Sequence, residues 1–350
     1  MNTKYRIQAF WKYFISIQKD LEESLRTNNT NELKRINTDM NEKLKSVCGC
    51  GVEVEMNETG FYEMTFATGG NKTAQIVAAV LKKDAPKQLA DNWIINAFRP
   101  PLSEKAMHTV FNSTEKQYSG VDFKVYYTIV DATKTLELKV YCEGLVGMDS
   151  DYRDQLVAYM LELFIGELEF EARISHVEVI DEESDEENVC LLPNLYEDIC
   201  DIIIEREWHE YQDPLSIYVA YKLDKKPVSD TLHNDRLLIV TTHPQLQEEL
   251  INKEYVTSKE FVSLGGTYGY LYYEVLYEDE KEAILRQQLE KEIHDLLYPL
   301  SIARTIGGAI GIHYSYIDVA IFDKDAFSLA LEKMNKKMKF KIYYKSVGDE

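Results

Sequence analysis

The sequence predicts an α+β protein with two similar lobes and an N-terminal helical hairpin. Each lobe is expected to be a mostly antiparallel sheet with helices packed on one face, in a ferredoxin-like or related arrangement. Apolar residues recur at spacings of three and four in some segments and alternate with polar residues in others. The 350 residues suffice for about two domains. We expect the hairpin at 1–46, the first lobe at 47–180, an acidic linker at 181–190 and the second lobe at 191–350.

The N-terminal segment predicts two helices. Apolar residues from Trp11 to Leu25 form one stripe at helical spacing. The segment TNNTNE at 27–32 interrupts the pattern, and its Thr30 or Asn31 can cap the second helix. The two helices are therefore expected to form a hairpin.

The first lobe alternates strands and helices. Its strands show alternating apolar residues, and its helices carry apolar residues on one side. In chain order we expect the hairpin GVEVEM and FYEMTFAT, a helix with Ile76, Val77, Val80 and Leu81 on one side, the strand WIINAF (93–98), the hairpin FKVYYTIV and LELKVYCEG, a helix at 151–164 and the strand ARISHVEVI (172–180).

An acidic run, DEESDEE at 181–187, separates the lobes and holds six acids in seven positions. Such a run is expected to be solvated and flexible. In the second lobe we expect a helix at 195–211, strands in LSIYVAYKL and RLLIVTTH, a helix from Pro244, the strand YGYLYYEVLY, a helix at 279–297, the strand IHYSYIDVAIF, a helix at 325–336 and the strand MKFKIYY (338–344). Segments 165–181 and 306–323 resemble two copies of one unit, which suggests an internal repeat.

A glycine motif occurs twice in the second lobe. SLGGTYGYLYYEV (263–275) and TIGGAIGIHYSYIDV (305–319) share an apolar residue, Gly-Gly-x-x-Gly and tyrosines that follow. A phosphate loop needs glycines that open a helix, whereas these precede strands, so we interpret them as bends that use positive φ, a bulge or close backbone approach. The alternative is a ligand site where the bends meet, in which the Arg304 guanidinium suits a carboxylate or phosphate. Its residues would be Arg304, Gly307, Gly308, Tyr268, Tyr272 and Tyr314.

Other motifs do not complete a catalytic, cofactor or metal site. In TFATGGNKT a phosphate-binding loop would need glycines where Phe66 and Asn71 stand, so a tight turn with a capped helix is favoured. The pair CGC at 48–50 has no second pair at metal-ligand spacing, and HEYQD at 209–213 ends on aspartate where a zinc protease has histidine. The seven histidines are dispersed, and no serine stands in a nucleophile elbow. We therefore predict no cofactor, no metal and no catalytic residue, and favour a protein that is not an enzyme.

The net charge is −21, from 60 acids against 39 bases. A chain this acidic is expected to repel nucleic acid and anionic membranes and would be steered towards a basic partner, but the favoured explanation of the charge by itself is solubility alone. Its only basic cluster, the lysines at 333, 336, 337, 339, 341 and 345, is interpreted mainly as protection of an exposed sheet edge. Contact of these lysines with an anionic partner is the alternative.

The chain also predicts its compartment. No apolar run approaches the roughly 18–20 residues that cross a bilayer, and the opening segment lacks the features of a secretory signal. The five cysteines are odd in number and scattered, which favours reduced thiols. A cytoplasmic protein is expected.

Three segments resemble an uncharacterised family of bacterial cytoplasmic proteins. They are the N-terminal FWKYF, the segment DAPKQLADNWIINAFRPPL at 84–102 and the late strand YSYIDVAIFD. The resemblance implies no particular activity and assigns no catalytic residues.

Two functional hypotheses follow, and the sequence leaves the oligomeric state open. The leading one is a non-enzymatic acidic protein that engages a basic protein partner, as an inhibitor or immunity-type protein would. The other is an enzyme or sensor that binds a small anionic molecule at the paired glycine motifs. A structural role within a larger assembly is not distinguishable from the first hypothesis at this level.

Overall fold

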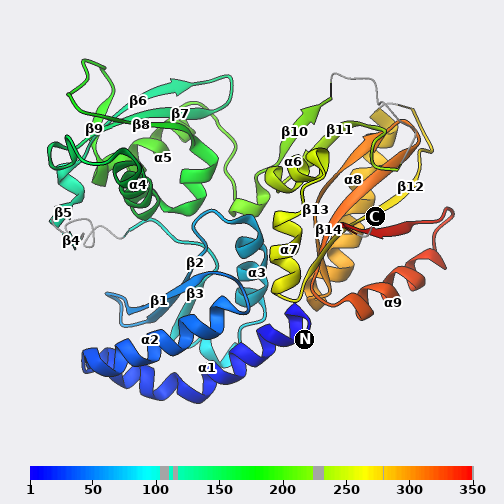
Figure 1. Ribbon diagram of the computed structural model, residues 1–350, viewed down its shortest axis with the longest axis horizontal. Helices are drawn as coiled ribbons and strands as arrows, with labels where there is room; N and C mark the ends of the chain where they lie inside the picture. The colour runs from blue at the N-terminus through cyan, green and yellow to red at the C-terminus, as the bar shows by residue number, and fades with distance from the viewer. Residues whose placement is uncertain (103–109, 113–116, 224–231, 279, 349–350) are drawn as a thin grey trace. The chain divides into compact units, whose positions relative to one another are not determined.

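The computed structural model describes residues 1–102, 110–112, 117–223, 232–278 and 280–348 (Figure 1). Contacts divide the chain into two compact units. Unit 1 combines Met1–Ala97 with Ile217–Glu350, and unit 2 is Phe98–Ser216. The chain therefore leaves unit 1 once, after Ala97, and returns to it at Ile217, and the linker expected at 181–190 lies inside unit 2.

The α+β class and the N-terminal helix pair are confirmed. Helix α1 (Thr3–Arg26) is capped by Asn2, whose side chain accepts a hydrogen bond from the backbone N–H of Tyr5. Helix α2 (Thr30–Lys45) is capped by Asn29, one residue before the expected cap. The apolar stripe of α1, which includes Ile7, Phe10, Trp11, Phe14 and Leu21, is buried.

The first sheet of unit 1 has three strands in the order β1-β2-β3. Strands β1 (Gly51–Met56) and β2 (Tyr62–Ala67) form the expected antiparallel hairpin. Strand β3 (Trp93–Asn96) runs parallel to β2, and the intervening helix α3 (Lys72–Lys83) provides the long crossover that a parallel pair needs.

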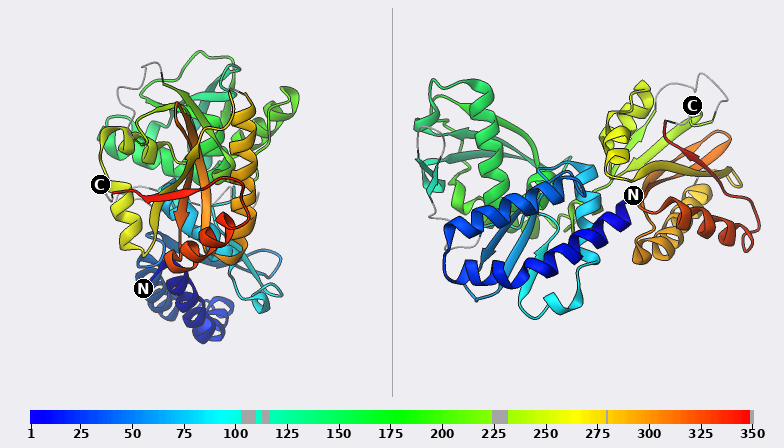
Figure 2. Two further views of the ribbon diagram at one scale, coloured as in Figure 1. Left: turned by 90° about the vertical axis from the view of Figure 1, so that its right-hand side faces the viewer. Right: turned by 60° about the horizontal axis from the view of Figure 1, so that its bottom comes forward.

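The second sheet of unit 1 has six antiparallel strands in the order β10-β11-β13-β14-β12-β15. Helices cover both of its faces, whereas one covered face was expected. Leu271 and Ile317 face α8 and α9, and Tyr268 on the opposite face packs on Phe261 of α7. In the left view of Figure 2, α6 and α7 lie on one side of the strands and α8 on the other. The elements are β10 (Val219–Lys222), β11 (Arg236–Thr241), α6 (Pro244–Asn252), α7 (Val256–Ser263), β12 (Thr267–Glu274), α8 (Glu280–Leu297), β13 (Ala303–Gly311), β14 (Tyr314–Ile321), α9 (Lys324–Asn335) and β15 (Tyr343–Ser346).

Unit 2 is built on a four-stranded sheet in the order β8-β7-β6-β9. One face packs against α4 and α5 through an apolar cluster that includes Phe123, Leu138, Met160 and Ile199. The connection from β8 to β9 must pass over β7 and β6, and the acidic run 181–187 makes this crossing. The elements are β4 (Val110–Asn112) and β5 (Gln117–Ser119), which pair with each other, then β6 (Lys124–Val130), β7 (Thr135–Tyr141), α4 (Ser150–Arg173), β8 (Ile174–Ile180), β9 (Val189–Leu191) and α5 (Leu195–Glu205).

The predicted repeat is wrong. Segment 165–181 is the end of α4 followed by β8, whereas 306–323 forms most of the β13–β14 hairpin. Helix α4 continues nine residues past the predicted end at 164, across a kink at Gly166, whose φ is +78°. A Cβ at Gly166 would lie 2.8 Å from the backbone nitrogen of Pro101, so only glycine allows this contact. The apolar periodicity of the two segments is similar, but their backbone conformations differ.

Two element boundaries and one strand also differ from expectation. Helix α5 ends at Glu205, well before the predicted end at 211, and residues 209–213 lie outside any helix. The final strand is limited to Tyr343–Ser346, so most of MKFKIYY is irregular. Strand β13 was not predicted, because its glycines were interpreted as a bend. Among the described residues, no helix has the length and apolar character needed to cross a membrane.

Candidate functional site

The second glycine motif lies inside a strand. Gly307 has φ +123°, and the register of β13 against β14 shifts between Thr305 and Gly307, as at a β-bulge. A Cβ at Gly307 would lie 2.1 Å from the carbonyl oxygen of Val240. One at Gly308 would lie 2.0 Å from the carbonyl oxygen of Tyr316. Positive φ, a bulge and close backbone approach therefore all occur here, and these glycines do not open a helix.

The absence of a side chain at Gly308 also makes room for a buried guanidinium from α8. An added Cβ would come 2.9 Å from Nη1 of Arg286. That nitrogen donates to a carboxylate oxygen of Glu290 at 2.9 Å, and the Tyr218 hydroxyl donates to the same carboxylate at 3.4 Å. Burial, with Glu290 nearby, raises the pKa of Tyr218 to about 12. The glycine thus lets a charged pair lie between helix and sheet.

The first glycine motif has a different role. Gly265 has φ +85°, and a Cβ there would lie 2.5 Å from the carbonyl oxygen of Met1. The backbone N–H of Thr3 donates to the carbonyl of Gly265, and the Thr3 hydroxyl donates to Leu264. This motif therefore joins the start of α1 to the turn before β12, while the second motif accommodates α8.

The tyrosines and arginine of the predicted ligand site do not all converge. Tyr268 is fully buried, and its hydroxyl shares a hydrogen bond with Thr73 at 3.0 Å. Tyr272 and Tyr314 do meet, edge to face, with ring centroids 5.6 Å apart. Arg304 of β13 lies opposite Ala320 of β14. Ala320 is six residues from Tyr314 along β14, which at the rise of a strand places Arg304 about 20 Å from Tyr314 along the sheet. The structure thus brings two of the four side chains together.

A buried polar network, missed by the sequence analysis, ties α6 to the six-stranded sheet. Arg236 donates to the Gln247 side chain at 2.8 Å, and Gln247 donates to Asp318 at 2.7 Å. Burial raises the pKa of Asp318 to about 6, against the opposing effects of Arg236 and the Gln247 hydrogen bond. The three residues of this network are far apart in the sequence. The one sequence feature that could have indicated it is an aspartate, Asp318, within the apolar strand YSYIDVAIF.

A second part of this interior is organised around Asp235. Its carboxylate accepts hydrogen bonds from the Tyr316 hydroxyl at 2.5 Å and from the backbone N–H groups of His313 and Tyr314. Asp235 therefore holds the turn between β13 and β14. Tyr316 in turn accepts from the backbone N–H of His233 at 2.8 Å.

His243 caps α6 from a buried position. Its Nδ1 accepts a hydrogen bond from the backbone N–H of Leu246 at 3.3 Å, while its Nε2 is buried without a hydrogen-bond partner among the described residues. Burial, with Lys72 nearby, lowers the pKa of His243 to about 3. The ring is therefore neutral at pH 7 and acts as a helix cap.

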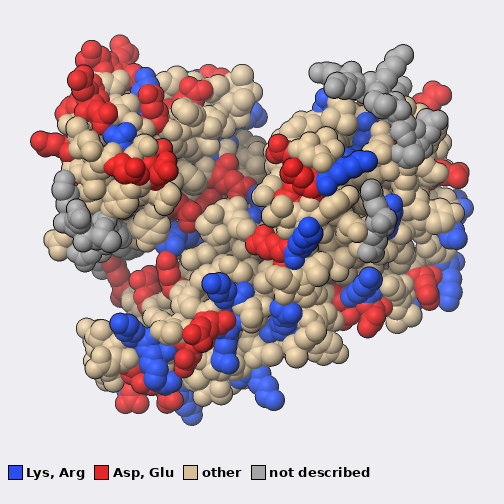
Figure 3. All heavy atoms as spheres, viewed as in Figure 1, with Lys and Arg blue, Asp and Glu red and all other residues tan. Residues whose placement is uncertain are grey.

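The surface of unit 2 carries most of the net charge. Residues 98–216 contain 27 acids and nine bases, net −18, which leaves 33 acids and 30 bases, net −3, for unit 1. On the face shown in Figure 3, red side chains gather over unit 2, whereas unit 1 shows both signs. Among the described residues of unit 2, eighteen acidic side chains are exposed but only two basic ones, Lys134 and Arg206.

Most of the accessible bases of unit 2 are already paired. Lys124 bonds Glu183 at 2.6 Å, and Lys139 bonds Glu186 at 2.7 Å. Arg153 pairs with Asp181, and Arg206 pairs with Asp131. The acidic run is thus held by ion pairs to Lys124 and Lys139 of the sheet and to Arg153 of α4, and is not the free linker that was expected.

Helix α5 shows the unpaired part of this surface most clearly. Glu197, Asp201 and Glu205 follow one another at intervals of four and are exposed, so their carboxylates form a stripe on one side of the helix. Ile204, 70% exposed, stands beside them. Repulsion between neighbouring carboxylates is unfavourable in the free protein, and a basic partner would relieve it.

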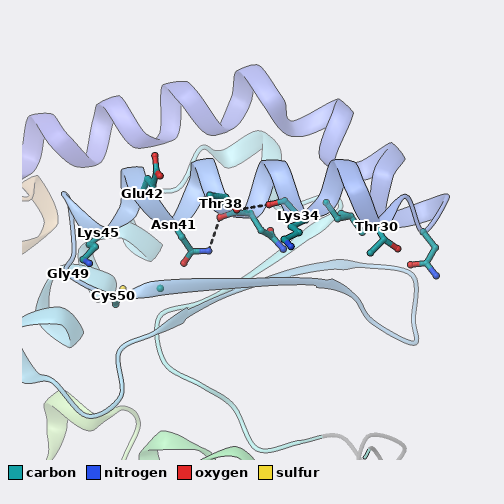
Figure 4. Close-up of a pocket in the computed structure, with 12 residues that line it drawn as sticks. Thr30, Lys34, Thr38, Asn41, Glu42, Lys45, Gly49 and Cys50 are labelled. Carbon is teal, nitrogen blue, oxygen red and sulfur yellow. Dashed lines mark hydrogen bonds between the residues drawn. The ribbon is translucent and has the colours of Figure 1, made fainter. Parts of the chain in front are cut away.

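A long open groove of about 810 Å³ runs between α2 and the start of β1 in unit 1 (Figure 4). Asn41 spans it, because its side chain accepts from the backbone N–H of Val52 at 2.9 Å and donates to the carbonyl of Asn37 at 2.8 Å. Its lining carries both signs of charge, Lys34 and Lys45 with Glu42. This mixture selects no class of ligand.

The metal-like and nucleotide-like motifs that the sequence disfavoured as sites have structural roles. Cys50 lines the groove between α2 and β1. Burial, together with the nearby Cys50, holds the pKa of Cys48 well above its ordinary value, so the Cys48 thiol stays protonated. Gly69 and Gly70 have positive φ and lead to Asn71, which caps α3 through the N–H of Ala74, so the turn and capped helix are confirmed. The described ranges contain no group of three His, Cys, Asp or Glu that could hold a metal ion.

Comparisons with protein-family models, with curated proteins and with solved structures find no match to this chain.

Proposed function

We propose that this chain is a non-enzymatic binding protein that engages a basic protein partner through the acidic surface of unit 2. One observation supports this most strongly: residues 98–216 hold −18 of the −21 charges, on a surface with eighteen exposed acids and two exposed bases among its described residues. Solubility alone needs a net charge away from zero but not its concentration in one unit.

The energetics favour a partner of opposite charge. Like charges packed on one small domain repel each other and lower its stability. A basic surface placed against them removes that repulsion and raises the rate of encounter by electrostatic steering. The exposed Ile204 among the carboxylates of α5 supplies an apolar contact beside the charged ones.

The test is a pull-down from the cells that make the protein, at physiological salt. The tagged full chain is compared with a variant carrying Glu197→Lys, Asp201→Lys and Glu205→Lys. The matched control carries Asp20→Lys, Glu248→Lys and Glu292→Lys, three exposed acids of unit 1. We expect a basic protein with the wild type and the control and its loss with the α5 variant.

Two results would contradict the proposal. One is recovery of no partner, or of neutral and acidic partners only. The other is equal loss of the partner from both triple variants, because that would mean total charge matters and its location does not.

A small anionic ligand remains the second candidate. Its support is Arg304, which is half-buried with its guanidinium 5.0 Å from the centroid of the Tyr298 ring. Within the described residues no carboxylate forms an ion pair with Arg304, so its charge is available to an anion. Calorimetric titration with inorganic phosphate and with citrate, on the wild type and Arg304→Gln, tests this site: heat that disappears in the variant supports it, and no heat removes it.

Two narrower expectations stay predictions. One is membership of the uncharacterised bacterial cytoplasmic family that the chain resembles. The other is a ferredoxin-like or related arrangement of each lobe, although the two large sheets differ in strand number and order. A solved structure of a chain sharing FWKYF and the 84–102 segment would test both.

A further inference from the structure

An apolar groove lies between the end of α8 and α9 in unit 1. Its volume is about 360 Å³, within the range of ligand sites in proteins. The side chains that line it are hydrophobic except for two lysines, and no acidic residue is among them. All of its lining residues belong to unit 1, and Arg304 is not among them.

Three of the leucines that line this groove are exposed at the surface. Leu296, Leu300 and Leu329 are 46%, 58% and 52% exposed. Their exposure is unusual because leucines on a folded domain are mostly buried, and a grouped set of exposed ones marks an interaction site. Ala326 and Ala330, one turn apart on α9, also line the groove, and their small side chains let another backbone approach closely.

The rim is basic. Lys333 lines the groove from α9, and Lys337 lines it from just after the helix. The sequence favoured protection of a sheet edge for this lysine cluster, but only Lys345 lies on the edge strand β15. Lys333 and Lys337 stand four residues apart beside exposed leucines, which is the arrangement of a groove that selects an acidic ligand.

We propose that this groove docks an amphipathic helix that presents large apolar side chains flanked by glutamate or aspartate. Apolar residues at helical spacing would fill the space between the leucines, and acidic residues four apart would face Lys333 and Lys337. A fatty acid suits the groove less well. Its single carboxylate needs one lysine, and walls that are half exposed would leave much of its chain in water.

The acidic character of the whole chain does not prevent this interaction. At physiological ionic strength the Debye length is about 8 Å, so distant carboxylates are screened while the adjacent lysines act directly. Unit 1 is also close to neutral, with 33 acids and 30 bases. This inference is independent of the basic partner proposed for unit 2.

The test measures fluorescence anisotropy of labelled synthetic peptides with the full-length protein at physiological salt. One peptide is an amphipathic helix with two leucines four residues apart and glutamates beside them; its control has glutamine in place of each glutamate. We expect the glutamate peptide to bind about tenfold more tightly than the glutamine peptide, as two close charge pairs would give. The double variant Lys333→Glu with Lys337→Glu should abolish the preference for the glutamate peptide. Leu329→Asn, at an exposed position, should weaken the binding of both peptides.

The control variant is Lys339→Glu with Lys341→Glu, which makes the same change of charge in the same cluster outside the groove. It should keep the preference for the glutamate peptide. Equal loss in both double variants, equal affinity of the wild type for the two peptides, or no binding at about 1 mM would each overturn the proposal. So would saturable binding of laurate that Leu329→Asn weakens while neither peptide binds, because the groove would then be a lipid site.

Discussion

The two units place their charge differently. Unit 2 has a net charge of −18 with its acids mainly at the surface, and the helix-facing side of its sheet packs in an apolar cluster. Unit 1 has a net charge of −3, but Asp318, Arg236 and His243 are buried around its six-stranded sheet. The surface of unit 2 is therefore suited to meet a basic molecule, whereas these three polar groups of unit 1 are committed to its own interior.

This difference has consequences for how each unit responds to solution conditions. Buried ionisable groups make stability depend on pH, because their pKa values differ between the folded and unfolded states. Exposed carboxylates respond mainly to salt and to cationic partners, because water and ions screen them. We therefore expect substitutions inside unit 1 to change stability and substitutions on unit 2 to change binding.

The largest effect is expected for Gly307→Ala. The new Cβ would meet the carbonyl oxygen of Val240 at 2.1 Å in a backbone with φ +123°, so β11 and β13 would have to separate. The loss of unfolding free energy should exceed about 4 kcal/mol, or the protein should fail to fold. Gly147→Ala in unit 2 is the control, because φ there is also positive, at +77°, but nothing lies within 4 Å. The control substitution should lower the free energy of unfolding by about 1–2 kcal/mol. Similar losses for the two variants in chemical denaturation would contradict the prediction, because positive φ alone would then explain the effect at Gly307 without the contact to Val240.

The next effect is expected for Asp318→Asn. The folded pKa, about 6, lies above the ordinary aspartate value of 3.8, so the folded state retains the proton longer. Asp318 therefore favours folding most at low pH, and this contribution is lost as pH rises from about 4 to 6. The free energy of unfolding of the Asn variant relative to wild type should rise by on the order of 3 kcal/mol between pH 4 and pH 7. A pH-independent difference in denaturation midpoints would contradict the assignment.

A smaller effect of opposite sign is expected for His243→Asn. The folded pKa, about 3, is below the ordinary 6.5, so the folded state disfavours the proton. Its contribution is fully present above pH 6.5 and is lost as pH falls towards 3. Asparagine keeps a side-chain acceptor for the N–H of Leu246, so the cap is retained. Between pH 7 and pH 5 the unfolding free energy of the wild type should fall by about 2 kcal/mol more than that of the variant. Equal falls, measured by urea denaturation at the two pH values, would contradict this interpretation.

Local patterns predicted many elements of both units. The α1–α2 hairpin, the β1–β2 hairpin and the β6–β7 hairpin follow from periodicity and turn residues close together in the chain. Strand β13 was missed because three glycines lower strand propensity, and only its neighbours β11 and β14 make glycine necessary there. Helix α4 was predicted to end at 164, because the contact of Gly166 with Pro101, which lets the helix continue across a kink, is not visible in the sequence.

The interior and the charge distribution were harder to foresee for the same reason. Arg236, Gln247 and Asp318 lie on three elements and meet only in the folded sheet. The concentration of charge can be counted once the boundary of unit 2 is known. That boundary could not be inferred from the sequence, because Met1–Ala97 packs with Ile217–Glu350 and the acidic run lies within unit 2.

The most direct test of the central claim is carbodiimide cross-linking of the full chain to a lysine-rich synthetic peptide, with the cross-linked carboxylates mapped by mass spectrometry. Of the 60 acids, 27 lie in residues 98–216 and 33 lie elsewhere. We predict that cross-links fall overwhelmingly in 98–216, with Glu197, Asp201 and Glu205 among them, and diminish together as salt is raised. A distribution near 27 to 33, as indiscriminate attraction to an acidic chain would give, would contradict the account.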